Sequence, residues 1–305
     1  MSTYEAKIVA DSISPHGHRI TSIQATFPRF ILAEMNTHRV FSRNSASSRA
    51  IPVEKNIKRI EDNPFVPLAF TKNQKGMQAK EEVEVSAQIS SKNAWLELLD
   101  HALRAARVLL GAGVHKQHAN RLLEAFAWHT AIITATEWQN FWALRVSPDA
   151  QPEMDTTASV MKEAYDKSEP KKLEYGKWHL PYVDPGEMRA GETWMNWAKI
   201  SAARCARVST LTQEGKLDTI ADLGLYTKLV TPGHMSPLEH PCRPMTEWEH
   251  DNLFKEPQYM WDDAEENWIW TGDYTYFLGN VQGWVQLRKL IPNEHNFALI
   301  KEKKA

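Results

Sequence analysis

Residues 35–52, MNTHRVFSRNSASSRAIP, gather arginines and small hydroxyls at a spacing that could bind phosphate. The eleven residues from Arg39 to Arg49 hold three arginines, four serines and one asparagine, and His38 precedes them. Arginine presents a planar fork of donors that matches phosphate oxygens. Composition alone favours a solvated loop, but the order H-R-x-x-S-x-N-x-x-S-x-R indicates a nucleotide or cofactor pocket.

That order resembles the signature of the flavin-dependent thymidylate synthases, R-H-R-x-x-S-x-N-E-x-S-x-R. Thr37 stands where the family has its first arginine, and Ser45 stands where it has glutamate. The matching residues are His38, Arg39, Ser42, Asn44, Ser47 and Arg49.

Four further stretches resemble elements of the same family. Residues 140–153 resemble N-F-x-x-L-R followed by A-Q-x-E, and residues 116–124 resemble the segment that sends an arginine to the nucleotide phosphate. Residues 204–210 resemble A-R-V-S, and residues 233–240 resemble G-H-x-S/T-P-x-E-H. In segment 116–124 the register leaves Asn120 or Arg121, and we favour Arg121 because a guanidinium suits phosphate.

The resemblance implies a role for each matched residue. Arg145 would be catalytic, binding the uracil ring of dUMP and stabilising its anion, and Glu34 stands where the family has a nucleotide-contacting glutamine. The dUMP site would comprise Glu34, Ser45, Ser47, Arg49, Arg121 and Arg145. The FAD site would comprise His38, Arg39, Ser42, Asn44, Asn140, Ser209, His234 and Ser236.

The implied reaction is C5 methylation of dUMP to dTMP, with methylenetetrahydrofolate as carbon donor, reduced FAD as hydride donor and NADPH as the reductant of the flavin. A flavin-dependent hydroxymethylase of dUMP or dCMP for modified phage DNA is an alternative, because Glu34 and Ser45 depart from the family pattern. A non-catalytic flavin- or nucleotide-binding protein is a second alternative, motivated by Thr37.

The motif order is unusual for the family. The A-R-V-S and S-P-x-E-H elements normally precede the H-R-x-x-S motif, but here they follow it, as in a permuted variant similar to long forms encoded by bacteriophages. We therefore expect a half at 1–170 and a half at 188–305, integrated in one catalytic domain. The resemblance also implies a homotetramer whose sites combine several subunits.

Periodicity predicts an α/β (α+β) protein, and the resemblance implies a mixed or antiparallel sheet with flanking helices, the fold of the family. We expect strands at 4–13 and 19–27 and a helix over 28–38 that delivers His38, followed by a loop. Further helices are expected at 92–110, 115–126, 136–145, 152–167, 192–206 and 217–230, with 53–82 as a surface connection.

Composition narrows the function classes. A formal net charge of −2 argues against nucleic-acid binding, and no apolar stretch approaches the ~20 residues of a membrane span. The N-terminus has no signal-peptide pattern, so a cytoplasmic protein is expected, in a bacterium or encoded by a phage.

Cys242 and two histidines invite other chemistries. Cys242, between His240 and Arg243, could be a thiolate nucleophile, but we favour a small buried core residue. His234 and His240 lie too far apart for a usual zinc pattern, so we expect no metal site.

Overall fold

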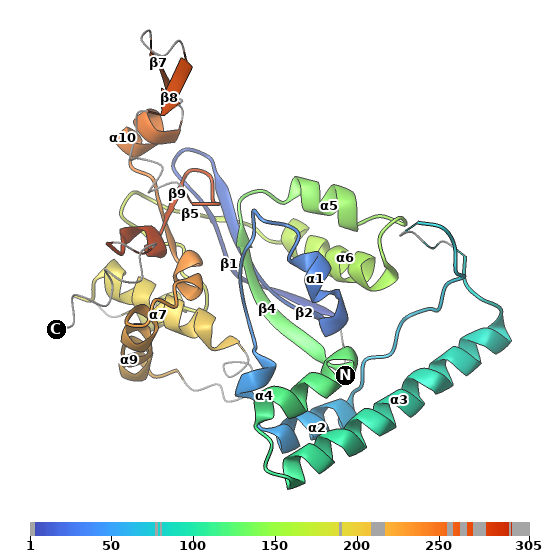
Figure 1. The fold of residues 1–305 in the computed structure, drawn as a ribbon. Helices are drawn as coiled ribbons and strands as arrows, with labels where there is room; N and C mark the ends of the chain where they lie inside the picture. Colours follow the sequence, from blue (N-terminus) through green and yellow to red (C-terminus); the bar gives the residue numbers. More distant parts are fainter. Residues whose placement is uncertain are drawn as a thin grey trace.

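The computed structural model describes residues 4–76, 79, 81–188, 191–208, 217–254, 259–262, 267–270, 279–292 and 294 of the 305-residue chain. A mixed five-stranded sheet lies at its centre, in the order β3-β4-β2-β1-β5 (Figure 1). Neighbouring strands are antiparallel except β1 and β5. The strands are β1 (Glu5–Ile13), β2 (Arg19–Pro28), β3 (Ser42–Ser45), β4 (Trp128–Ala135) and β5 (Lys171–Lys172). The predicted class, α/β (α+β) with flanking helices, is confirmed.

One face of the sheet is apolar and carries the main core. Alternate residues of β2 and β4, such as Phe27 and Ile133, pack against buried side chains of the neighbouring helices because side chains of a strand alternate between its two faces. These helices are η1 (Arg29–Ile31), α1 (Leu32–Met35), α5 (Gln139–Arg145) and α6 (Pro152–Asp166). Pro152 occupies the first turn of α6, where its missing N–H costs nothing.

The opposite face of the sheet is polar at its centre and is covered by the C-terminal part of the chain. A buried chain of hydrogen bonds crosses this face: His240 contacts Thr134 (2.8 Å), Thr134 contacts Ser22 (2.5 Å), and Ser22 contacts His179 (2.8 Å). His179 also contacts Ser12 (3.0 Å). These bonds fix how the C-terminal part docks on the sheet, because an unpaired buried polar group is costly.

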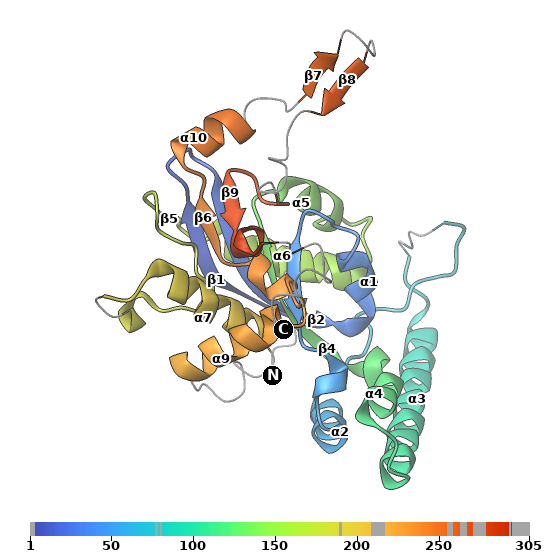
Figure 2. The same ribbon diagram turned by 60° about the vertical axis from the view of Figure 1, so that its left-hand side comes forward.

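Two helices of the C-terminal part, α7 (Trp194–Ala206) and α9 (Thr219–Val230), pack beside the sheet (Figures 1 and 2). Thr193 and Asp218 cap the two helices by accepting backbone N–H groups of the first turn. The elements of the C-terminal part are η4 (Pro185–Glu187), α7 (Trp194–Ala206), α9 (Thr219–Val230), η5 (Ser236–Glu239), β6 (Cys242–Pro244), α10 (Glu247–Glu249), η6 (His250–Phe254), β7 (Tyr259–Asp262), β8 (Asn267–Trp270), β9 (Trp284–Gln286) and η8 (Leu287–Leu290).

A second core lies where β4 begins. It is built from the buried faces of two helices and two short segments, with Leu103 and Leu123 among its residues, and η2 (Ser48–Ala50) leads into the first helix. The other elements are α2 (Val53–Asp62), α3 (Val85–Gly111), α4 (Lys116–Ala119) and η3 (Asn120–Phe126). Among the described residues, we find no helix whose length and apolar content would let it span a membrane.

Several predicted elements differ from the structure. The helix expected over 28–38 is only a 3-10 turn followed by one short α-helix, and the expected surface connection at 53–82 contains α2. Residues 42–45, expected as loop, form the edge strand β3 because the edge of β4 offers them unpaired backbone groups. No strand was expected at 128–135, where β4 lies inside the sheet between β3 and β2.

Candidate active site

Arg145, at the C-terminal end of α5, is held by three side chains from the segment 34–38. Its Nε donates to Nε2 of His38 at 3.0 Å, its Nη1 lies 3.3 Å from a carboxylate oxygen of Glu34, and its Nη2 lies 3.4 Å from the hydroxyl of Thr37. We call these four residues the Arg145 cluster. The structure therefore brings together three predicted site residues, and Thr37, a departure from the family signature, joins them.

His38 is the buried member of the Arg145 cluster. Burial of the ring, and then the charges of Arg145 and Arg43, lower the pKa of His38 to about 4. Arginine can only donate, so Nε2 of His38 must be unprotonated, and the neutral ring carries its proton on Nδ1. His38 thus orients the guanidinium as a neutral acceptor, and its ring packs edge-on against Phe141.

Arg43 is a residue of the first motif that the sequence reasoning did not single out. Its Nη1 donates to the backbone carbonyls of Met35 (2.9 Å) and His38 (3.1 Å). These carbonyls lie at the end of α1 and in the turn after it, where each also accepts one backbone N–H, from His38 and Phe41 respectively. Arg43 therefore fixes the turn that carries Thr37 and His38, and it is a variable position in the signature, so spacing alone did not reveal it.

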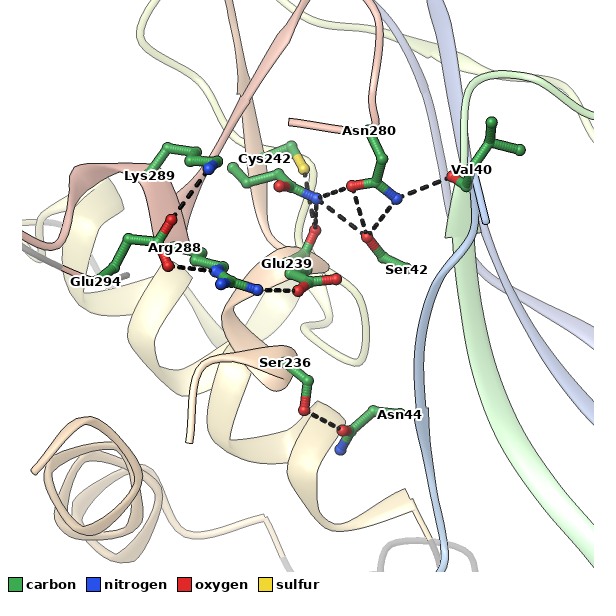
Figure 3. A network of polar contacts seen from close by, with 11 residues as sticks. Val40, Ser42, Asn44, Ser236, Glu239, Cys242, Asn280, Arg288, Lys289 and Glu294 are labelled. Carbon is green, nitrogen blue, oxygen red and sulfur yellow. Dashed lines mark hydrogen bonds and ion pairs between the residues drawn. The ribbon is translucent and has the colours of Figure 1, made fainter. Parts of the chain in front are cut away.

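Ser42 lies in a buried network with two amide side chains from the C-terminal segment (Figure 3). Gln286 Nε2 carries two hydrogens and lies within hydrogen-bond distance of three acceptors: Ser42 Oγ (3.0 Å), Asn280 Oδ1 (2.9 Å) and the backbone carbonyl of Glu239 (3.1 Å). Asn280 Nδ2 donates to the carbonyl of Val40 (2.8 Å) and to Ser42 Oγ (3.0 Å). We call Ser42, Asn280 and Gln286 the amide network. Sequence reasoning missed Asn280 and Gln286, because no spacing pattern links residues so far apart.

Asn44 and Ser236 meet although 192 residues separate them, as Figure 3 shows. Ser236 Oγ donates to Asn44 Oδ1 at 2.9 Å, and Asn44 Nδ2 donates to the backbone carbonyl of Cys205 at 3.0 Å. Three of the motifs noted in the sequence therefore converge beside β3. Next to them, Arg288 pairs with Glu239 (2.5 Å) and Glu294 (2.6 Å).

The residues predicted to hold the nucleotide phosphate lie on an exposed part of the surface. The side chains of Ser45, Ser47, Arg49 and Arg121 are exposed, and Arg121 pairs with Glu124 (3.1 Å). Asn120, the other residue that the register allowed, is fully buried and donates to the backbone carbonyls of Ser48 and Ile51.

The remaining predicted flavin residues have mixed positions. Arg39, Asn140 and His234 are exposed. Ser209 lies outside the described residues.

Cys242 is fully buried, and burial raises the pKa of its thiol well above the ordinary value. This agrees with the prediction of a core residue, because a nucleophilic thiolate needs a lowered pKa and access to substrate. His240 is likewise fully buried while His234 is exposed, so the two rings face different surroundings.

A pocket of about 330 Å³ lies next to residues 46–48, between α2, η3 and the start of β4. Ala46, Ser48, Arg59 and Asn120 are among its lining residues, which include neither the Arg145 cluster nor the amide network. We therefore assign the pocket no part in the candidate site.

Comparison with known proteins gives a family and two similar structures. Residues 9–171 match the family described as thymidylate synthase complementing protein. A UMP/dUMP methylase from Streptomyces cacaoi, PolB, solved with 5-Br UMP, has 18% identity and a TM-score of 0.46, and the similarity covers 55% of this chain and 90% of that chain. The same protein with 5-Br dUMP has 16% identity, a TM-score of 0.46 and coverage of 54% and 91%. No curated protein matches the sequence.

Proposed function

The chain belongs to the thymidylate synthase complementing protein family, the flavin-dependent thymidylate synthases that its motifs resemble, and from this premise we propose that it methylates dUMP at C5. Family membership supports the coarser statement, a flavin-dependent enzyme that modifies a uridine nucleotide. The finer proposal is transfer of a one-carbon unit from methylenetetrahydrofolate, with NADPH as the external reductant.

The observation that carries the proposal is the Arg145 cluster. A positively charged guanidinium, partly shielded from water and fixed by a neutral histidine, can stabilise negative charge that develops on a pyrimidine ring. Its orientation is set before substrate binds, because His38 accepts from Nε and Thr37 lies beside Nη2. Arg145 has five N–H donors, so donors remain for a ring carbonyl or ring nitrogen.

The residues near Asn44 fit a flavin. The short side chains of Asn44 and Ser236 lie in contact beside β3, and His234 and Arg39, which are exposed and near them in the sequence, are donors of a kind that suits a diphosphate. These residues would bind and orient FAD. When bound and reduced, FAD supplies the hydride that completes the methyl group. Arg145 would hold the pyrimidine, whose C5 proton leaves when the new carbon bond is complete.

We also propose that the nucleotide site is shared between chains. Among the described residues, no hydrogen bond or ion pair joins Ser47, Arg49 or Arg121 to the Arg145 cluster. The side chains of Ser47, Arg49 and Arg121 are exposed, so they are free to face a second subunit, as the homotetramer that the family resemblance implies would require.

The proposal is tested by release of tritium from [5-³H]dUMP. Substitution at C5 must release the label, so we expect tritiated water only when FAD, NADPH and methylenetetrahydrofolate are all present. Absence of release from protein that binds FAD and dUMP would contradict the proposal and support a non-catalytic binding protein.

One observation favours a second candidate, a reaction at dCMP. Glu34 lies 3.3 Å from Arg145, so an acceptor and a donor stand side by side. Cytosine presents an amino donor at C4 and acceptors at N3 and O2, whereas uracil presents an acceptor at O4. Uracil also carries a donor, N3–H, between two carbonyls, so Glu34 and Arg145 select cytosine only if the carboxylate faces C4, and [5-³H]dCMP in a parallel reaction tests it.

A further inference from the structure

We propose that Asn280 and Gln286 are positioning residues of the flavin site, although both lie outside the part of the chain that matches the family. They set the distance between the H-R-x-x-S-x-N-x-x-S-x-R motif at 38–49 and the S-P-L-E-H element at 236–240. The inference rests on the proposed function, because it assumes that Asn44 and Ser236 bind FAD.

The amide network joins these two segments through their backbone carbonyls. Asn280 donates to the carbonyl of Val40 (Figure 3), and Gln286 donates to the carbonyl of Glu239. Both amides also meet at Ser42. Ser42 is fully buried and Gln286 is 2% exposed, so water cannot replace the bond between them, whereas the bond from Asn280 to Val40 lies at the surface.

The residues that the network holds lie close in the chain to Asn44 and Ser236. Asn44 follows Ser42 by two residues on the same strand β3, and Ser236 precedes Glu239 within the single turn η5. A shift of Val40 relative to Glu239 must therefore change the separation of Asn44 and Ser236. The hydroxyl of Ser42, which the family resemblance assigned to FAD, is used internally, and its role here is to hold both amides.

Gln286 acts as a donor, and this explains why its amide is needed. Its Nε2 faces three acceptors: Ser42 Oγ, Asn280 Oδ1 and the carbonyl of Glu239. A carboxylate at this position would place an anion against oxygen atoms in a buried site, which is costly. An apolar side chain of equal size would fill the space but would remove the bond to the carbonyl of Glu239, leaving that carbonyl only the weak Cys242 Sγ donor at 3.5 Å.

Gly279 makes room for this amide. A Cβ atom built on Gly279 would overlap Oε1 and Cδ of Gln286. The Gln286 side chain is pinned by its hydrogen bonds, so a methyl group at position 279 must push the amide out of the network. Gly279→Ala therefore disturbs the network while leaving all its polar residues in place.

The test is titration of the purified full chain with FAD and, separately, with dUMP. We compare Gln286→Met, Gln286→Glu and Gly279→Ala with wild type. The matched control is Gln282→Ala, an exposed glutamine on the same segment. FAD binding is followed by quenching of flavin fluorescence, dUMP binding by calorimetry, and folding by near-UV circular dichroism and Tm.

We expect Gln286→Met and Gly279→Ala to weaken FAD binding about tenfold, equivalent to about 1.4 kcal/mol. Gln286→Glu should weaken it further, and Gln282→Ala should leave it unchanged. Affinity for dUMP should change less than twofold in every variant, because within the described part of the chain no hydrogen bond joins the network to the charged groups of the proposed dUMP site, Arg49, Arg121 and the Arg145 cluster. A purely structural role would instead lower both affinities together.

The outcomes separate the two proposals. Wild-type protein that binds no FAD would overturn the proposed function. Wild type that binds FAD, with variants that bind it equally well, would overturn only the positioning role. Loss of the fold in all three variants, or parallel loss of FAD and dUMP binding, would show that the network is structural and would also overturn it.

Discussion

Acid should unfold this protein in a pH range set by buried histidines rather than by carboxylates. His38, His129, His179 and His240 have exposed fractions of 8, 3, 1 and 0%. Burial lowers the pKa of His38 and His129 to about 4 and that of His179 and His240 to about 3. All four are therefore neutral in the folded state at pH 5.5, whereas in the unfolded chain their pKa is about 6.5.

The magnitude follows from proton linkage. Below pH 6.5 the unfolded chain binds protons at these histidines while the folded protein does not. The free energy of unfolding is therefore highest above pH 6.5 and declines as the pH falls toward 4. Between pH 7.5 and 5.5 each histidine lowers the free energy of unfolding by about 1.4 kcal/mol, and four together by about 5 kcal/mol. That is comparable with the whole stability of many domains, about 5–15 kcal/mol.

Urea unfolding followed by circular dichroism at pH 7.5, 6.5 and 5.5 measures this loss. His179→Gln keeps a hydrogen-bonding group beside Ser22 but cannot titrate, so it should reduce the pH dependence by about a quarter. The matched control is His118→Gln, at an exposed histidine, which should keep the wild-type dependence. A free energy of unfolding that is equal at pH 7.5 and 5.5 would refute the reasoning.

Three further predictions concern the site. Arg145→Ala should lower turnover at least ~100-fold while FAD still binds, as measured by tritium release and flavin fluorescence; wild-type turnover would show that the nucleotide site is misassigned. Cys242→Ser should keep turnover while lowering Tm, because it buries a hydroxyl; complete loss in folded protein would restore the thiolate mechanism. Glu34→Gln should shift the ratio of kcat/KM for dUMP over that for dCMP upward by roughly tenfold, measured with both labelled nucleotides; an unchanged ratio would remove Glu34 from base selection.

The sequence predicted the parts of the fold that have strong periodicity. The strands β1 and β2 follow an alternation of apolar residues, and the long helix α3 contains the segment 92–110 whose apolar residues recur at helical spacing, as expected. The sheet was harder to predict because β3 is polar throughout and exists only through pairing with β4, while β4 is apolar on both faces near its centre. Such strands carry no period-2 pattern that could distinguish them from loop or buried helix.

The candidate site shows a similar division. Motif order identified Arg145, Glu34 and His38, and the structure places them in contact. Their partners were harder to predict: Gln286 reaches Ser42 across 244 residues. A single sequence contains no signal for such a pairing. The roles of Arg49, Arg121 and Ser47 stay predictions, as does the division of the chain near 170–188.

The central claim is that this chain methylates dUMP at C5, and the mass of the product tests it most directly. Purified protein would be incubated with FAD, NADPH, methylenetetrahydrofolate and dUMP, with dCMP in a parallel reaction, and the nucleotides analysed by mass spectrometry. We predict a gain of one methyl group on dUMP. An unchanged mass for both nucleotides, in protein that binds FAD, would contradict the claim, and a hydroxymethyl gain or reaction with dCMP alone would replace it with the alternative that Glu34 motivates.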